Sequence, residues 1–311
     1  MPELPEVETV ARGLREATLG HAVVAVRWLD PRMVRGTVDA QTMRARLVDQ
    51  HVAGVERQGK FLVWRFQSGA GLLLHLGMSG RLTAEVPPET PFKPHTHVAV
   101  LMDHGFEVRL QDPRRFGRVA WLESGAPIHP KLGPDALSRG FTRKVLEERV
   151  NGRQASIKSL LLDQGVVAGI GNIYADEALF RARVHPARRG GSLRSEEVGR
   201  LYRALRKVLR EALAHRGTTF RSFEDAEGRE GAFLPHLNVY GRAGKACRRC
   251  RAAIFTMVVG GRTSAFCPRC QPASEPVGSR GATTVKQGTE SKRTHERLGG
   301  SSPNAALQSD G

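Results

Sequence analysis

The chain has 311 residues, of which 40% are hydrophobic and 25% charged, and its formal net charge at pH 7 is +17. This length and composition suit a globular protein with more than one domain, and no apolar run approaches the roughly 20 residues that a membrane-spanning helix needs. The opening residues MPELPEVETV have acids where a secretory signal needs cations and an apolar stretch, so we expect a cytoplasmic protein without membrane association. The positive charge favours a polyanionic partner such as nucleic acid, although acidic lipid, ribosomal RNA or a merely solvated cationic surface fits the charge as well.

Residues 1–131 are predicted to form mostly β-structure behind one leading helix. Pro2 and Glu3 suit a first helical turn, and apolar residues then recur at helical spacing as far as Leu14. Short strand-like runs separated by Gly, Pro and Asp follow, and this pattern favours a β-sandwich or flattened barrel. The strands are expected at Ala22–Trp28, Lys60–Phe66, Gly71–Leu76, His97–Met102, Phe106–Leu110 and Arg118–Leu122.

The hydrophobic period changes to that of helices in residues 132–235, which we assign to a second domain. The last predicted helix is long and amphipathic with a basic face, and Ser195 suits its capped start. We expect a cleft where the sandwich and the helices meet. The helices are expected at Thr142–Val150, Ile157–Leu162, Asn172–Arg181 and Ser195–His215.

The four cysteines of the chain lie close together near its C-terminus, at Cys247, Cys250, Cys267 and Cys270. Their spacing, C-x2-C-x16-C-x2-C, is typical of a four-thiolate zinc ribbon, with two disulfides or four free thiols as the alternative. Residues 255–266 between the two pairs favour a β-hairpin with a Gly-Gly turn, which puts Arg262 at or next to the tip. We therefore predict one structural Zn²⁺ in residues 236–271, and a disordered tail over residues 272–311.

Pro2 is also a candidate nucleophile. Removal of Met1 would expose a secondary α-amine, and such amines have a pKa of about 8, against about 10.4 for lysine. Attack on an aldehyde-like sugar carbon would form an iminium, which remains cationic and acts as an electron sink for elimination. Glu3 and Glu6 are close enough in sequence to act as acid, base or electrostatic partner. A favourable helix start explains the same residues, so taken by themselves they leave both interpretations open.

Seven motifs occur together and in one order: MPELPEVETV (1–10), QGKFL (58–62), HLGMSG (75–80), DPRRFG (112–117), GIGNIYADEALF (169–180), VYGR (239–242) and the terminal cysteine ribbon. In these motifs the chain resembles bacterial formamidopyrimidine-DNA glycosylases over about residues 1–271. The resemblance implies an α+β multidomain fold with an N-terminal β-sandwich and leading helix, a helical helix-two-turn-helix domain and a C-terminal zinc ribbon. It also implies a monomeric enzyme of base excision repair that binds damaged double-stranded DNA, excises oxidised purines and cleaves the strand.

The resemblance assigns chemistry to four side chains. Pro2 corresponds to the Schiff-base nucleophile at the deoxyribose anomeric carbon, and Glu3 to the acid that assists base loss. Lys60 corresponds to a residue of β-elimination and phosphate contact. Arg262 corresponds to a residue of δ-elimination, where a guanidinium would stabilise the leaving phosphate.

Further positions correspond to substrate and DNA contacts. A glycosylase takes its target base out of the stack, and Met78, Arg114 and Phe116 match the residues that fill the vacated space. Phe116 would wedge between bases and Arg114 would contact the orphaned cytosine. The amides at the helix start after the Gly169–Gly171 turn would suit a phosphate. The remaining predicted contacts are Glu6, His95, Arg153, Lys158 and Asn172.

Three alternatives remain to be distinguished. An endonuclease VIII-like enzyme would prefer oxidised pyrimidines, but PELPEVE and the intact DPRRFG favour the purine branch. A non-catalytic zinc-ribbon DNA-binding protein would keep the clamp without the chemistry. A general RNA-binding accessory would fit the charge but not the N-terminal motif. The segment Thr218–Leu234 matches a region that includes a loop over the everted base, and its sequence does not reveal a base preference.

Overall fold

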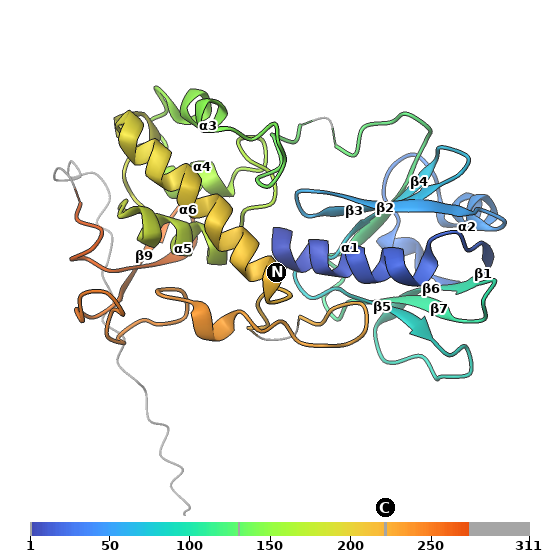
Figure 1. Ribbon diagram of the computed structural model, residues 1–311. Helices are drawn as coiled ribbons and strands as arrows, with labels where there is room; N and C mark the ends of the chain where they lie inside the picture. Colours follow the sequence, from blue (N-terminus) through green and yellow to red (C-terminus); the bar gives the residue numbers. More distant parts are fainter. Residues whose placement is uncertain (1, 130, 221–222, 274–311) are drawn as a thin grey trace, which may run out of the picture.

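The computed structural model of the chain describes residues 2–129, 131–220 and 223–273. A leading helix and two four-stranded sheets are followed by a group of helices and a two-stranded hairpin (Figure 1). The predicted α+β fold class is therefore confirmed. None of the described helices is both long and apolar enough to cross a membrane. The predicted disordered tail lies outside the described residues from residue 274 onward.

The sandwich consists of two antiparallel sheets with the strand orders β1-β6-β7-β5 and β2-β3-β4-β8. The first sheet contains β1 (Val23–Leu29), β6 (Thr96–Met102), β7 (Glu107–Gln111) and β5 (Arg81–Val86). The second sheet contains β2 (Val52–Gln58), β3 (Phe61–Phe66), β4 (Gly71–His75) and β8 (Arg118–Leu122). Apolar residues of both sheets face inward and form one shared core.

Helix α1 (Leu4–Thr18) covers the side of the sandwich where the edge strands β2 and β5 lie. It contacts both strands, and its apolar residues Val7, Val10 and Leu14 join the core between the sheets. Figure 1 shows this helix running lengthwise between the two sheets. Leu4, in its first turn, belongs instead to the core of the helical region. One helix is thus shared by two hydrophobic cores.

Strands β2 and β5 and helix α2 (Ala40–Leu47) are absent from the sequence-based prediction. Both strands lie at sheet edges, where one side of the strand faces solvent and polar residues interrupt the apolar pattern. Helix α2 buries only Met43 and Leu47, and two apolar residues are too few to define a helical period. These elements are therefore set by packing rather than by a local signal.

The helical region surrounds a second core. Its helices are α3 (Arg143–Val150), α4 (Ile157–Leu162), α5 (Asn172–Ala182) and α6 (Ser195–Ala214), which agree with the predicted helices to within one residue at each end. The long helix α6 packs against α5, α3 and the start of α1. Short 3₁₀ turns occur at Pro31–Met33, Gly190–Ser192 and Leu234–His236.

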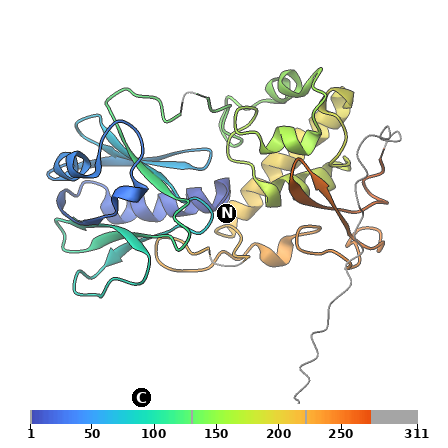
Figure 2. The same ribbon diagram turned by 180° about the vertical axis from the view of Figure 1, so that it is seen from behind.

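The predicted hairpin is confirmed as β9 (Phe255–Val259) and β10 (Arg262–Phe266), which pair in register around the Gly260-Gly261 turn. Seen from behind, the hairpin lies beside the helical region, where β10 contacts α5 (Figure 2). A small core that includes Phe180 and Val239 joins the cysteine module to the helices. The orientation of the hairpin, and with it that of Arg262, is therefore fixed by α5.

Candidate active site and DNA-contact residues

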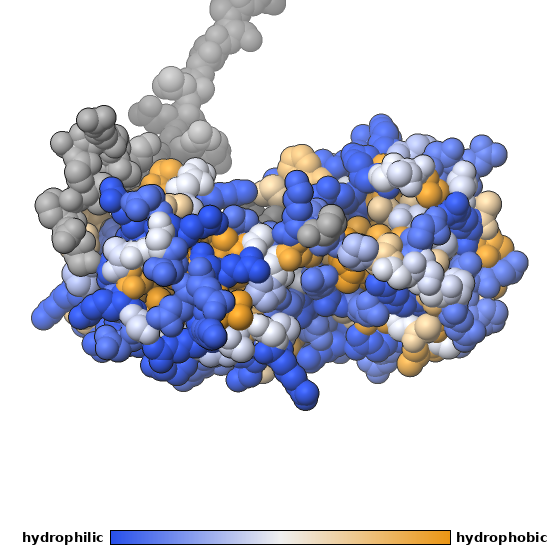
Figure 3. Space-filling model, turned by 90° about the horizontal axis from the view of Figure 1, so that it is seen from above, coloured by the Kyte–Doolittle hydropathy of each residue, from blue (hydrophilic) through white to orange (hydrophobic). Residues whose placement is uncertain are grey.

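A cavity of about 310 Å³ is formed jointly by the sandwich, the helical region and the segment that follows α6. It is lined by Pro2, Glu6, Met78, Ser79, Gly80, Arg114, Ile173, Thr218, Phe220, Phe223 and Tyr240. Three residues predicted from separate motifs, Pro2, Met78 and Arg114, therefore meet at one cavity. The face seen from above is mostly hydrophilic at its surface, with scattered apolar residues (Figure 3).

Glu3 lies immediately before α1, and its carboxylate is bound by the start of α5. The backbone N–H groups of Gly171, Ile173 and Tyr174 donate to it at 2.8, 2.9 and 3.3 Å. A Cβ at Gly171 would lie 2.4 Å from the Glu3 carboxyl carbon, so glycine is required there for close approach. These amides were predicted to suit a DNA phosphate, and the structure corrects this: they hold the Glu3 carboxylate instead.

Burial dominates the ionisation of the two acids at this end of the cavity. Burial raises the pKa of Glu3 above its usual range, although Lys60 and the three amides act in the opposite direction. Burial, followed by the charge of Glu3, raises the pKa of Glu6 to about 7. A carboxyl group with a raised pKa can hold a proton near neutral pH and donate it. The site therefore holds two buried carboxyl groups of raised pKa close to Pro2.

Glu6 connects three segments of the chain. Its carboxylate accepts the N–H of Glu3 at 2.8 Å, the N–H of Thr218 at 2.7 Å and the hydroxyl of Tyr174. A Cβ at Gly217 would lie 2.8 Å from the same carboxylate. Glu6 is therefore a lining and bridging residue that joins α1 to α5 and to the segment after α6.

Lys60 lies in the turn between β2 and β3 and is almost completely buried. Gly59, with φ of 59°, approaches Ala168 so closely that a Cβ would lie 2.9 Å from the Ala168 Cβ. Burial lowers the pKa of Lys60, Glu3 and Glu6 raise it, and Arg262 lowers it further. The lysine is therefore within electrostatic reach of the predicted acid and of the hairpin tip, and a lowered pKa suits proton transfer.

Arg262 is exposed at the first position of β10, next to the turn. The neighbouring carbonyl of Thr263 accepts a hydrogen bond from the Lys158 ammonium at 3.0 Å and another from the Asn172 amide at 3.0 Å. Lys158 and Asn172 thus hold the backbone beside Arg262.

A second prediction, that Lys158 contacts DNA, is wrong. The resemblance predicts a DNA contact for Lys158, but its side chain is completely buried and its ammonium lies 2.7 Å from Asp176. The Asp176 carboxylate also accepts the Ser264 hydroxyl and the Ala265 N–H, both at 2.9 Å. A buried ammonium paired in this way is not available to a phosphate. Its place in the structure is to join α4 and α5 to the hairpin.

Most of the remaining predicted DNA contacts are exposed. Phe116 is 55% exposed, and the Arg114 guanidinium lies 5.3 Å from the centre of its ring. His95 and Arg153 are exposed, and Met78 is half-buried at the cavity. These side chains are free to meet a ligand from outside, as the prediction requires.

The structure adds site residues that sequence reasoning missed. Tyr174 and Thr218 bond to each other at 3.0 Å as well as to Glu6, and Tyr240 lines the cavity. Tyr174 and Tyr240 are within the quoted motifs, but a tyrosine in an apolar segment has the same pattern as a core residue. Only the fold reveals their common location.

The four cysteines fit a tetrahedral zinc site. Their Sγ atoms all lie within 4.8 Å of one another, with Cys250–Cys267 at 3.4 Å and Cys247–Cys270 at 4.0 Å. Four thiolates at the usual zinc–sulfur distance of about 2.3 Å would lie about 3.8 Å apart. No fifth ligand group is close among the described residues, so the Zn²⁺ of this chain is structural.

Removing this zinc is expected to weaken DNA binding by about tenfold, as expected for the loss of one charge-assisted contact. Chelation or Cys247→Ser would release the hairpin and misplace Arg262, and fluorescence anisotropy with a lesion duplex would measure the change. Arg262→Ala, which keeps the zinc, should weaken DNA binding by a similar factor. Full affinity in the zinc-free protein would contradict the coupling between zinc and Arg262.

Three family models match consecutive parts of the chain. The formamidopyrimidine-DNA glycosylase N-terminal domain matches residues 1–119 and the formamidopyrimidine-DNA glycosylase H2TH domain residues 132–224. A zinc finger found in FPG and IleRS matches residues 244–273. The matched regions contain every residue assigned to the site except Tyr240.

Curated relatives cover the chain almost to its described end. A formamidopyrimidine-DNA glycosylase of Magnetococcus marinus is 44% identical over 88% of this chain and 100% of its own length. One of Symbiobacterium thermophilum is 46% identical over 89% of this chain and 91% of its own.

Solved structures show the same arrangement. The MutM (FPG) protein of Thermus thermophilus matches with a TM-score of 0.78 at 39% identity, over 88% of this chain and 100% of its own. A mutant FPG of Lactococcus lactis in complex with Fapy-dG-containing DNA matches with a TM-score of 0.81 at 31% identity, over 87% of this chain and 100% of its own. A MutM complex with DNA containing carbocyclic 8-oxo-G matches with a TM-score of 0.80 at 31% identity, over 87% and 100%. The chain therefore belongs to the formamidopyrimidine-DNA glycosylase family and is a DNA glycosylase of that type.

Proposed function

We propose that this enzyme excises oxidised purines, 8-oxoguanine and formamidopyrimidines, from duplex DNA and then cleaves the strand at the abasic site, acting as a monomer. The observation that carries the proposal is the location of Pro2 at a cavity beside two buried acids of raised pKa. Relatives of the same fold have been solved with Fapy-dG and 8-oxo-G DNA, which supports the substrate class.

The first step joins the Pro2 nitrogen to C1′ of the lesion nucleotide. Pro2 gives up its N–H proton as its nitrogen bonds to C1′, the bond between C1′ and the base breaks, and the base leaves with a proton. The bond between C1′ and the ring oxygen then breaks as that oxygen takes up a second proton, which opens the sugar. Glu3 is the proton donor in this step, because burial raises its pKa. The product is a cationic iminium between Pro2 and the opened sugar.

Strand cleavage follows by two eliminations. The iminium acidifies C2′, a base removes one C2′ proton, and the 3′ phosphate leaves by β-elimination. A second proton loss then expels the 5′ phosphate by δ-elimination. Lys60 is the proposed proton-transfer group, because the charges of Glu3 and Glu6 act on its buried ammonium, and Arg262 is the proposed partner of the charge that develops on the phosphate. Water then releases Pro2 from the sugar fragment.

Borohydride trapping on duplexes with 8-oxoguanine opposite each of the four bases tests this function. Reduction of the iminium should leave a covalent protein–DNA adduct, most abundant opposite cytosine. A protein that binds these duplexes without forming an adduct would be a non-catalytic clamp. An adduct only with oxidised pyrimidines would reassign the substrate class.

Affinity for a lesion duplex is expected to fall steeply with salt, because contacts to phosphates release counterions. Replacing one exposed contact, Arg153→Gln, should reduce the slope of log K against log salt by about one unit. Arg46→Gln serves as the control, since Arg46 is on α2 at the far end of the sandwich (Figure 1) and pairs with Glu123. A slope near zero for the unmodified protein would contradict a phosphate-binding cleft.

A further inference from the structure

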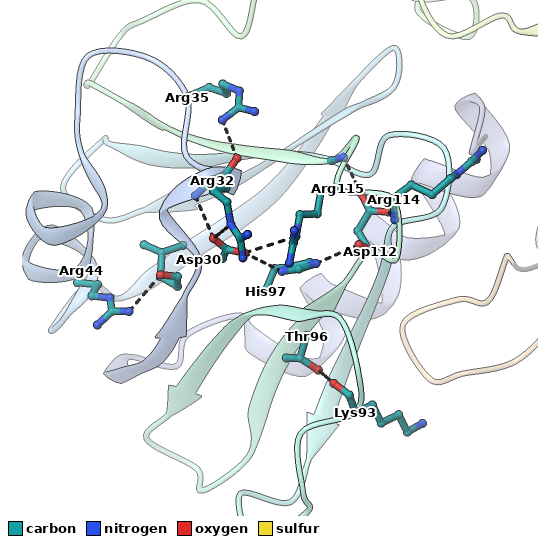
Figure 4. A network of polar contacts seen from close by, with 12 residues as sticks. Asp30, Arg32, Arg35, Arg44, Lys93, Thr96, His97, Asp112, Arg114 and Arg115 are labelled. Carbon is teal, nitrogen blue, oxygen red and sulfur yellow. Dashed lines mark hydrogen bonds and ion pairs between the residues drawn. The ribbon is translucent and has the colours of Figure 1, made fainter. Parts of the chain in front are cut away.

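The loop that carries Arg114 and Phe116 rests on a buried polar cluster that none of the site assignments includes. Asp30, His97 and Asp112 form this cluster, and their exposed fractions are only 2%, 3% and 0%. Figure 4 shows the three side chains grouped beneath the loop, with Arg114 extending away from them. Polar residues this deeply buried need partners, so their bonds show what the cluster holds in place.

Asp112 is the first residue of the loop, and its carboxylate also binds the last residue of the loop, Gly117. Its carboxylate accepts the N–H of Gly117 at 2.7 Å and that of Arg114 at 3.2 Å. Between them Arg115 takes the left-handed conformation, with φ of 53°, which a non-glycine residue rarely adopts unless its surroundings impose it. The shape of the loop therefore depends on where Asp112 is held.

His97, at the start of β6, holds Asp112 from beneath. Its Nε2 lies 3.0 Å from the Asp112 carbonyl oxygen, and its Nδ1 lies 3.1 Å from Asp30 Oδ2. Arg32 holds the pKa of Asp30 down to about 2, so Asp30 is an ionised carboxylate. The Asp30 carboxylate and the Asp112 carbonyl oxygen can only accept hydrogen bonds, so each ring nitrogen of His97 faces an acceptor.

Asp30 reaches the loop by a second route. The Arg115 guanidinium approaches the same carboxylate, with Nε 3.7 Å from Oδ2, while Arg32 donates to both of its oxygens at 3.0 Å. One acid therefore holds the first loop residue through His97 and the middle of the loop through Arg115.

We propose that the Asp30–His97 pair positions the Asp112–Gly117 loop, setting the depth at which Arg114 and Phe116 enter the base stack. The proposal rests on the proposed role of these two residues in filling the space of an everted base. Neither Asp30 nor His97 touches the cavity, so they act as positioning residues and not as catalytic ones. Misplacing a substrate-contacting group by about 1 Å can reduce a rate by about a hundredfold.

Two substitutions at His97 separate its two bonds. Gln is long enough to keep a donor near the Asp112 carbonyl, whereas Asn reaches only toward Asp30. His97→Asn should therefore slow single-turnover excision of 8-oxoguanine from a duplex by about ten- to a hundredfold. His97→Gln should recover part of that loss, because it keeps the bond to the loop but not the one to Asp30. Trapping on a preformed abasic site in single-stranded DNA, where no partner base must be replaced, should change less than about twofold in either variant.

Thr18→Val is the matched control. Thr18 is completely buried in the same sandwich, bonding to the Leu14 carbonyl at 2.7 Å and to the Trp64 indole at 3.1 Å, far from the loop in the fold. Thr18→Val should lower the melting temperature without changing the ratio of duplex excision to single-strand trapping. Equal losses on both substrates in His97→Asn, or no loss on either, would overturn the proposal. An unmodified enzyme that traps neither substrate would instead refute the proposed function.

Discussion

Replacing Pro2 with Gly is expected to reduce borohydride trapping on a lesion duplex by about a hundredfold or more. The reason is that the variant has a primary amine in place of the secondary amine of Pro2. A chain that keeps Met1 should show an even larger loss, since its Pro2 nitrogen is then an amide. Affinity for the duplex should stay within about twofold in both proteins, because Pro2 carries no phosphate contact. Gel analysis of trapped adducts and anisotropy measure the two quantities separately.

Pro5→Ala provides the control for this experiment. Pro5 is in the first turn of α1, three residues after Pro2, and is buried like Pro2, but it carries no free amine. Its replacement should leave trapping unchanged. Undiminished trapping in Pro2→Gly or in the protein that retains Met1 would show that another amine attacks the sugar, and Lys60 would be the first to test.

Replacing Glu3 with Gln is expected to slow excision of the damaged base by about 10²- to 10⁴-fold, the usual contribution of a positioned proton donor. The amide cannot donate a proton as a carboxylic acid does, and burial raises the pKa of the Glu3 carboxyl group. Cleavage of a preformed abasic site needs no base departure, so it should fall far less. Single-turnover kinetics on an 8-oxoguanine duplex and on an abasic duplex give the two rates.

The substitution also disturbs the start of α5, because the Gln amide nitrogen would face one of three N–H donors. Thermal melting therefore accompanies the kinetics. Glu16→Gln, at an exposed position on the same helix, is the control for surface charge. Equal losses of excision and abasic-site cleavage would indicate a structural role for Glu3, and an unchanged excision rate would remove it from the mechanism.

The sequence predicts elements with a strong local signal and the residues in quoted motifs. The zinc ligands follow from spacing alone, and helices such as α6 follow from a regular apolar stripe. Edge strands β2 and β5 carry only a partial stripe, because one of their faces meets solvent. The local spacing of apolar residues therefore predicts an element only where burial recurs regularly along it.

Contacts between residues that are distant in sequence cannot be predicted from local patterns. Glu3 meets the α5 amides across about 170 residues, and nothing near Glu3 reveals that those amides are already used. The same applies to Lys158, which the resemblance assigns to DNA contact but whose ammonium is buried against Asp176. The motifs identify which residues gather at the site, and the fold decides which of them face the ligand.

Helix α1 extends from one core into the other. Its first residue, Leu4, packs among the helices and donates its N–H to Gly169 at 3.0 Å, while Val7 to Leu14 pack between the sheets. Neither the sandwich nor the helical region can then unfold without removing packing contacts of the other. Calorimetry should therefore record a single cooperative transition. A hinge between the halves would also carry Pro2 and Glu3 along with α5. The reactive end of the chain thus stays aligned with the helices, and any opening movement would take place against the loops of the sandwich.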